Sequence, residues 1–372
     1  MKKSNIRAIV FIAILSMLVG AMAGCTTTTG GTGGNVDVGI VLPTKDEPRW
    51  VQDETRFKEA LKDTKYSVEI LFSQGSSANE KQNVESLITK GIKVLIICPH
   101  DGDAAAAAAE AAKAEGITVI SYDRLITGTD AVDYYVTFDS VAVGEAQGQY
   151  LVDNATGKGN PLYLYAGAAS DNNAFLFFEG AWNVLQPKIA DGTFEVKNSS
   201  EANSLKSKAT LTRDEMSKII GQVTTNWDFN EAKNKAEAHL TSAAASDKGD
   251  VFILAPNDGT ARSIADTFAS DNDVASYVIT GQDAEKASVQ YIIDGKQTMT
   301  VFKDVRSLVK DSIDMAVAVL DGGKPETTGS YNNKNIDVPA KQTEVIVVDQ
   351  ANVKAALVDS GYYEASEFTN LK

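Results

Sequence analysis

Short runs of β-branched and aliphatic residues alternate with amphipathic stretches along most of this chain. Four such runs in the first part read as buried parallel strands, at 36–42, 67–72, 94–98 and 118–122. Between them lie stretches of helical period, near 50–61, 78–90 and 103–115. Strand–helix–strand repeats of this kind build a parallel sheet with helices on its faces.

A second series of the same kind follows along the chain. Its expected strands lie near 162–166, 251–255, 277–280 and 298–302, and its expected helices near 174–189, 230–245, 260–269, 285–293 and 304–320. A chain of 372 residues also exceeds the roughly 250–300 residues at which single cores stop growing. The pattern predicts an α/β protein with two doubly wound parallel-sheet lobes. The polar stretch 198–218 has no clear period and is expected to be an insertion or a long loop.

Charge and composition exclude several classes of function. The net charge of -15 argues against a nucleic-acid partner, because phosphate binding needs clustered Lys and Arg. With 2 Cys and 2 His, a metal site of nitrogen and sulfur ligands is not expected. The sequence shows no glycine-rich phosphate loop, so no cofactor is expected either.

The N-terminus has the order of a targeting segment. Lys2, Lys3 and Arg7 precede an uncharged run over 8–24, and Cys25 follows two small residues. This order resembles a bacterial lipoprotein signal peptide over 1–24 with Cys25 as the lipidated residue, followed by a flexible tether over 25–35. A transmembrane anchor is the alternative, but 17 uncharged residues are short for a bilayer of about 30 Å. The sequence therefore predicts an extracytoplasmic protein, anchored by lipid to the cell membrane.

Polar and aromatic side chains gather just after the expected strands. In doubly wound folds, ligands bind beyond the carboxyl ends of the strands. A sugar ring offers hydroxyls that carboxylate, amide and guanidinium groups bridge with two hydrogen bonds, and apolar faces that aromatic rings cover. The candidates for such a site are Arg49, Trp50, Asp123, Arg124, Asp171, Asn173, Trp227, Asn257, Asp283 and Lys303.

Each candidate also has a purely structural alternative. Asp123 and Arg124 would suit a surface ion pair, Asn257 and Asp283 would suit helix caps, and Trp227 would suit a packing role. Other conspicuous residues are expected to be structural only: His100 and His239 on the surface or in loops, and the aromatic cluster 175–178 in the core of a helix.

Seven segments, in order along the chain, resemble the xylose-binding and multiple-sugar-binding proteins of bacterial ABC importers. The match runs from about residue 36 to 363. Each motif is weak alone, but seven in the same order are specific. The segments are 38–40 with 43–45, 49–50, 122–126, 135–139, 171–174, 281–284 and 302–304.

The resemblance implies the type I periplasmic-binding-protein fold, with two lobes joined by a three-strand hinge. The crossovers are expected near 138–141, 300–303 and 337–343. The first lobe would comprise 36–139 plus about 304–340, and the second 140–303 plus about 341–372. Carried over to this sequence, the resemblance places Arg49, Trp50, Asp123 and Arg124 on the first lobe, Asn173, Trp227, Asn257 and Asp283 on the second, Lys303 near a crossover, and Asp171 as a weaker candidate.

The function implied is the binding of a monosaccharide between the lobes and its delivery to the permease of an ABC importer. Xylose, glucose, galactose and arabinose all remain open as ligands. A sensor that presents the sugar to a membrane receptor would use the same site. A glycoside hydrolase would need two carboxylates flanking a glycosidic bond, and is less favoured. A transcriptional repressor of this fold is disfavoured, because no basic headpiece precedes residue 36.

Overall fold

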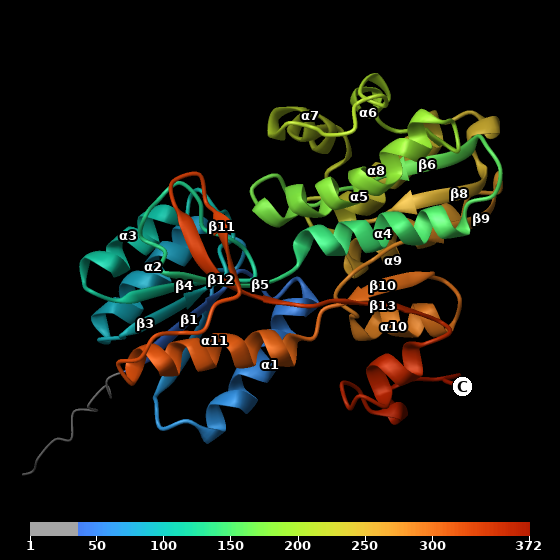
Figure 1. Cartoon of the computed structure of the whole chain (residues 1–372). Helices are drawn as coiled ribbons and strands as arrows, with labels where there is room; N and C mark the ends of the chain where they lie inside the picture. Colours follow the sequence, from blue (N-terminus) through green and yellow to red (C-terminus); the bar gives the residue numbers. More distant parts are fainter. Residues whose placement is uncertain (1–35) are drawn as a thin grey trace, which may run out of the picture. The chain divides into compact units, whose positions relative to one another are not determined.

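The computed structural model describes residues 36–372 (Figure 1). The expected signal peptide, the lipidation site Cys25 and the tether over 25–35 lie outside the described residues. Within residues 36–372, no helix has the length and apolar character needed to cross a bilayer.

The first lobe is built on a seven-stranded sheet. Six of its strands are parallel, and β11 is antiparallel to its neighbour β12. The strand order is β11-β12-β5-β4-β3-β1-β2. The strands are β1 (Val38–Leu42), β2 (Val68–Phe72), β3 (Val94–Ile97), β4 (Thr118–Tyr122), β5 (Tyr134–Phe138), β11 (Gly329–Asn332) and β12 (Asp337–Thr343).

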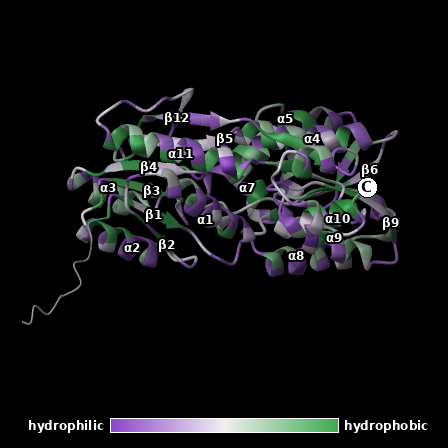
Figure 2. Cartoon of the chain, turned by 90° about the horizontal axis from the view of Figure 1, so that it is seen from below, coloured by the Kyte–Doolittle hydropathy of each residue, from purple (hydrophilic) through white to green (hydrophobic). Residues whose placement is uncertain are grey.

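Helices cover both faces of this sheet, which explains why its central strands are apolar throughout (green in Figure 2). On one face, α1 (Pro48–Ala60) and α11 (Val305–Leu320) bury side chains such as Phe57 and Leu308. On the other face, α2 (Ser77–Thr89) and α3 (Ala106–Ala114) do the same with Val84, Leu87 and three alanines. These are the expected helices, within a few residues at each end.

The second lobe has a smaller parallel sheet in the order β7-β6-β8-β9. Its strands are β6 (Asn160–Leu164), β7 (Phe194–Val196), β8 (Gly249–Leu254) and β9 (Val274–Ile279). Around it lie α4 (Ser140–Asn154), α5 (Asn172–Ala190), α8 (Phe229–Ser242), α9 (Asp258–Ala269) and α10 (Lys286–Ile293). A two-stranded antiparallel unit, β10 (Met299–Phe302) and β13 (Ile346–Asp349), joins it through a bridge between Gln282 and Val301.

The chain passes three times between the lobes. It leaves the first sheet after β5, returns after β10 to form α11, and leaves again after β12, since β13 begins three residues later and pairs with β10 (Figure 1). Because the strands of each sheet are parallel, their carboxyl ends and the loops after them lie along one edge of the sheet. In each lobe, loops from this edge line the cavity between the lobes.

The expectation of a long loop over 198–218 is wrong. The segment contains α6 (Ser200–Ser204) and leads into α7 (Arg213–Val223). A capping box between Thr212 and Glu215 starts α7, whose buried face carries Met216, Ile219, Ile220 and Val223. The stretch 198–218 shows no helical period because most of the apolar residues on this face of α7 come after residue 218.

Two glycines bring α4 and α5 into unusually close contact. A Cβ added to Gly144 would lie 1.9 Å from the main-chain oxygen of Phe177, and one added to Gly180 would lie 2.0 Å from that of Val141. Any larger residue would force the helices apart. This contact fixes α5, whose first turn faces the functional site.

Candidate functional site

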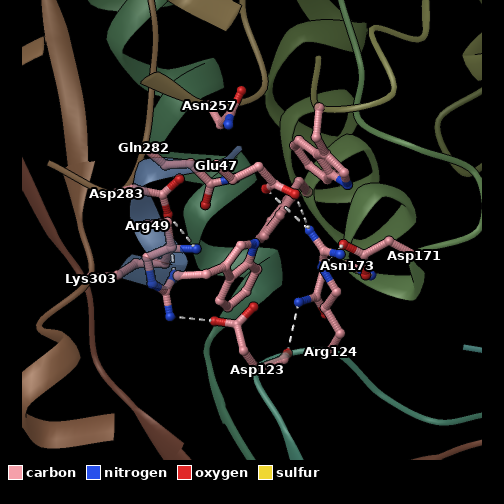
Figure 3. A pocket seen from close by; sticks show the side chains of 13 residues that line it. Glu47, Arg49, Asp123, Arg124, Asp171, Asn173, Asn257, Gln282, Asp283 and Lys303 are labelled. Carbon is pink, nitrogen blue, oxygen red and sulfur yellow. Dashed lines mark hydrogen bonds and ion pairs between the residues drawn. The ribbon is translucent and has the colours of Figure 1, made fainter. Parts of the chain in front are cut away.

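All ten predicted site residues line a single cavity between the lobes, with a space of about 300 Å³ that is partly open to solvent. Three residues that were not predicted, Glu47, Phe177 and Gln282, complete its lining. Figure 3 shows the polar members turned toward one another from opposite sides of this space.

The first lobe contributes Arg49 and Trp50 from the first turn of α1, which Pro48 starts. Arg49 is only 3% exposed. Its guanidinium donates two hydrogen bonds to Asp53, of 2.7 and 3.2 Å, and one of 2.8 Å to Asp123. Asp53, one turn further along α1, therefore fixes Arg49 from behind so that it points at the cavity.

Asp123 and Arg124 follow β4 directly. Asp123 has a left-handed φ of 58°, which turns its carboxylate back toward Arg49. The Arg124 guanidinium forms an ion pair of 3.0 Å with Asp171 and a longer one of 3.3 Å with Glu47. It also lies 4.9 Å from the Trp50 ring centroid, so the indole is held by cation–π contact.

The start of α5 places Asp171, Asn173 and Phe177 on the second lobe. Asp171 caps this helix by accepting a 2.9 Å hydrogen bond from the Asn173 backbone N–H. Asn173 Nδ2 donates across the lobes to the Asp123 main-chain oxygen at 2.8 Å. Phe177, one turn later, meets Trp227 edge to face at 6.2 Å between centroids.

The remaining side chains come from the ends of β8, β9 and β10. Asn257 caps α9 by accepting a hydrogen bond from the Thr260 backbone N–H, and it also lines the cavity. Its structural role as a cap is therefore compatible with its place in the lining. Asp283 caps no helix; with φ of 99° it turns inward to Lys303 at 2.7 Å and to Arg49 of the first lobe at 3.4 Å. Lys303 follows β10 directly.

A C-terminal tyrosine ties the same two lobes together near Asp283. The Tyr363 hydroxyl accepts a 3.1 Å hydrogen bond from Gln52 Nε2 on α1 and donates one of 2.9 Å to the Ala284 main-chain oxygen. This pair of bonds is called the Tyr363 link below.

Burial and charge act against each other in the site. Burial opposes ionisation of Asp123, but Arg49, Lys303 and Arg124 outweigh it and hold the pKa of Asp123 below its usual range. For Asp171 burial wins over the charge of Arg124 and raises its pKa to about 6. Burial would lower the pKa of Arg49, but Asp53, Asp123 and Asp283 raise it well above its usual value.

Three buried polar atoms of the lining have no hydrogen-bond partner within the described chain: Trp50 Nε1, Trp227 Nε1 and Gln282 Oε1. Buried polar groups are nearly always paired, and an unpaired one is costly. Two donors and one acceptor are thus free for a ligand, beside carboxylates and guanidiniums that can bridge neighbouring hydroxyls. The arrangement suits a small polyol ring with apolar faces.

The three unpredicted residues differ in how strongly the sequence pointed to them. Gln282 directly precedes Asp283, and Glu47 precedes the proline that starts α1. Phe177 was expected in the core of its helix, and that expectation is wrong in part: the ring is buried but lines the cavity. Its spacing of four residues from Asn173 was the available signal, since both then share one helix face.

The two lobes with one polar and aromatic cavity between them define a solute-binding protein. A family model, periplasmic binding protein domain, matches residues 38–324. The chain is 35% identical over 341 residues to a multiple sugar-binding periplasmic protein of Azospirillum brasilense, covering 89% of this chain and 90% of that protein. It is 30% identical over 333 residues to the D-xylose-binding periplasmic protein of Escherichia coli, covering 89% and 92%.

Solved structures agree with these relatives. A carbohydrate transporter solute-binding protein of Chloroflexus aurantiacus, in complex with D-glucose, is 75% identical, with a TM-score of 0.89 over 91% of this chain and 99% of that one. One of Clostridium phytofermentans with bound β-D-glucose is 34% identical, with a TM-score of 0.80 over 89% and 99%. The chain belongs to the periplasmic binding protein family, among its extracytoplasmic sugar-binding members. It is a binding protein with the type I fold, not an enzyme.

Proposed function

We propose that this protein binds one monosaccharide pyranose, such as D-glucose, between its lobes and delivers it to the permease of a carbohydrate ABC importer. One observation carries the proposal: a cavity of about 300 Å³ receives bidentate polar groups and aromatic rings from both lobes at once. The structure of the Chloroflexus protein with D-glucose supports the same class of ligand.

In this proposal the ten predicted side chains are the ligand contacts. Asp123 and Asp283 accept hydrogen bonds from ring hydroxyls, and Arg49, Arg124 and Lys303 donate. Asn173 and Asn257 do both, and Asp171 holds Arg124. The rings of Trp50 and Trp227 cover the apolar faces of the sugar. Glu47, Phe177 and Gln282 complete the contact surface.

The lobe division follows from the same proposal. We assign 36–139 with about 304–340 to the first lobe and 140–303 with about 341–372 to the second, with hinge crossings near 138–141, 300–303 and 337–343. The closed form, in which both lobes touch one sugar, is the form that the permease would accept. A ligand shifts the balance toward it only through contacts that differ between open and closed states.

Calorimetric titration with D-glucose, D-xylose, D-galactose and L-arabinose tests the ligand class. We expect at least one dissociation constant near or below about 1 µM, roughly -8 kcal/mol. A thermal-shift screen gives an independent reading, because a ligand at 100 times its Kd stabilises by about 2.7 kcal/mol. If no pyranose on the panel binds, the proposal fails.

We also propose that Cys25 carries the membrane anchor after removal of residues 1–24. The basic start, the uncharged run and the small residues before Cys25 support it. Expression of the full chain and its Cys25→Ser variant in a bacterium, followed by membrane fractionation, tests this. We expect the Cys25→Ser variant to be depleted from the membrane fraction. Equal amounts of the two proteins in that fraction would contradict the lipid anchor.

A further inference from the structure

A wider groove opens beside the sugar site. Its space is about 1,310 Å³ and open to solvent, against about 300 Å³ for the site. Both lobes line it, the first through residues such as Thr44 and His100, the second through residues such as Phe229 and Arg262. Glu47, Trp227 and Asn257 line the groove and the site alike. These three side chains therefore form a boundary that the two spaces share.

Glu47 is the loosest part of that boundary. Its side chain is 20% exposed, while those of the other charged residues of the site are only 3–7% exposed. Its contact with Arg124, at 3.3 Å, is longer than a good charged hydrogen bond of about 2.7–2.9 Å. Glu47 is therefore the charged residue of the lining that lies nearest to solvent, while its charge still stabilises the buried Arg124.

Trp227 is the fixed part of the boundary. Asn226 and Trp227 both have left-handed φ values, 51° and 62°, each costing on the order of 1–3 kcal/mol. The indole lies so close to Gly167 that a Cβ there would be 2.0 Å from the ring. The chain thus sustains backbone strain to hold this ring where the site and the groove meet.

Beyond Trp227 the groove offers an aromatic surface and polar groups. Phe229, the first residue of α8, is 44% exposed, which is unusual here because the other large exposed apolar residues among 36–372 are aliphatic. Arg262 and Glu285 line the same groove, and their 2.7 Å ion pair is largely buried. An exposed ring beside a fixed ionic pair resembles, in its chemistry, what the inner site presents to a sugar.

We propose that the groove is a second sugar subsite, which takes a pyranose ring linked to the one in the inner site and stacks it on Phe229. The proposal rests on the proposed function, because the inner site must hold the first ring. The link between the two rings passes beside Glu47 and Asn257. The protein would then bind disaccharides of a linkage that fits this passage, as well as monosaccharides.

Calorimetric titration of the protein with D-glucose and with cellobiose, maltose, isomaltose and trehalose tests the subsite. We expect at least one disaccharide to bind within about 10-fold of glucose. The Phe229→Ala variant should weaken that disaccharide about 2- to 12-fold, the range of a stacking contact, and leave glucose within about 2-fold. Ile346→Ala is the matched control, since it removes a 52% exposed apolar side chain outside the groove, and should change neither affinity.

The outcomes separate the two proposals. Glucose binding with no disaccharide binding overturns the subsite and leaves the proposed function intact. Disaccharide binding that is equal in the wild type and in Phe229→Ala also overturns the subsite as assigned. Failure of every sugar of both sizes overturns the proposed function and the subsite together.

Discussion

Replacing Asp123 by Asn tests the centre of the proposed site with almost no change of shape. Asp123 is 5% exposed and is held ionised by Arg49 at 2.8 Å and by the charges of Lys303 and Arg124. The amide removes the charge, so the charged partners left to Arg49 are Asp53 and, at 3.4 Å, Asp283. Truncating one member of a buried charged pair at a binding site costs about 2–5 kcal/mol. That corresponds to a Kd for D-glucose weakened about 30- to 5,000-fold.

Isothermal titration calorimetry measures this change, and urea unfolding of the free protein shows whether the variant remains folded. Glu47→Gln is the matched control, because it also neutralises a carboxylate of the lining, but a partly exposed one 3.3 Å from its partner. We expect Glu47→Gln to weaken binding less than Asp123→Asn does, because the Glu47 carboxylate is partly exposed and its ion pair is longer. An Asp123→Asn protein that is folded and binds glucose within about 3-fold of the wild type would refute the assignment of Asp123.

Three further changes test the fold around the site. Burial raises the pKa of Glu80 from 4.5 to about 7, so the folded protein loses stability as the pH rises through that range and this carboxyl ionises. The Glu80→Gln variant does not ionise there, so its free energy of unfolding in urea should increase relative to that of the wild type by up to about 3 kcal/mol between pH 4 and pH 8. The same pH dependence in both proteins would contradict this. Gly144→Ala should destabilise by about 1–3 kcal/mol or more because α4 and α5 must separate, whereas Gly221→Ala on α7, with open space around it, should stabilise slightly; similar effects of both would refute the packing argument. Tyr363→Phe breaks the Tyr363 link, and stopped-flow fluorescence should show glucose released several-fold faster; an unchanged rate would mean that the link does not favour closure.

One physical reason explains why the sequence predicted the central strands and why the candidate residues lie together around one cavity. Strands buried on both faces are apolar throughout, so β1, β3 and β4 stand out as short β-branched runs. Once the strands are located, the residues after them are located too, because a parallel sheet gathers its carboxyl ends at one edge. Asp123 and Lys303 were found in this way, directly after β4 and β10.

Elements shaped by close packing rather than by periodicity were harder to predict. Helix α4 was not predicted, since Gly144 and Gly148 disfavour a helix locally and are needed only because α5 approaches so closely. Phe177 packs with Val143 and Val301 and also lines the cavity, a position that depends on the rotation of α5 and leaves no trace in composition. Which lining atoms remain without a partner, as in Trp50 and Trp227, likewise depends on side-chain directions.

The contacts between the lobes are unevenly distributed, and this bears on how a sugar would close them. At the start of α5 they are short: 3.0 Å between Arg124 and Asp171, and 2.8 Å between Asn173 and the Asp123 backbone. On the Asp283 side the Arg49–Asp283 pair is longer, at 3.4 Å, and the Tyr363 link joins the lobes beside it through a 3.1 Å hydrogen bond from Gln52. A ligand that bridges Arg49 and Asp283 would add contacts at the longest of the ion pairs between the lobes. Because only contacts that differ between open and closed states shift the balance, we expect a sugar held by both Arg49 and Asp283 to favour closure.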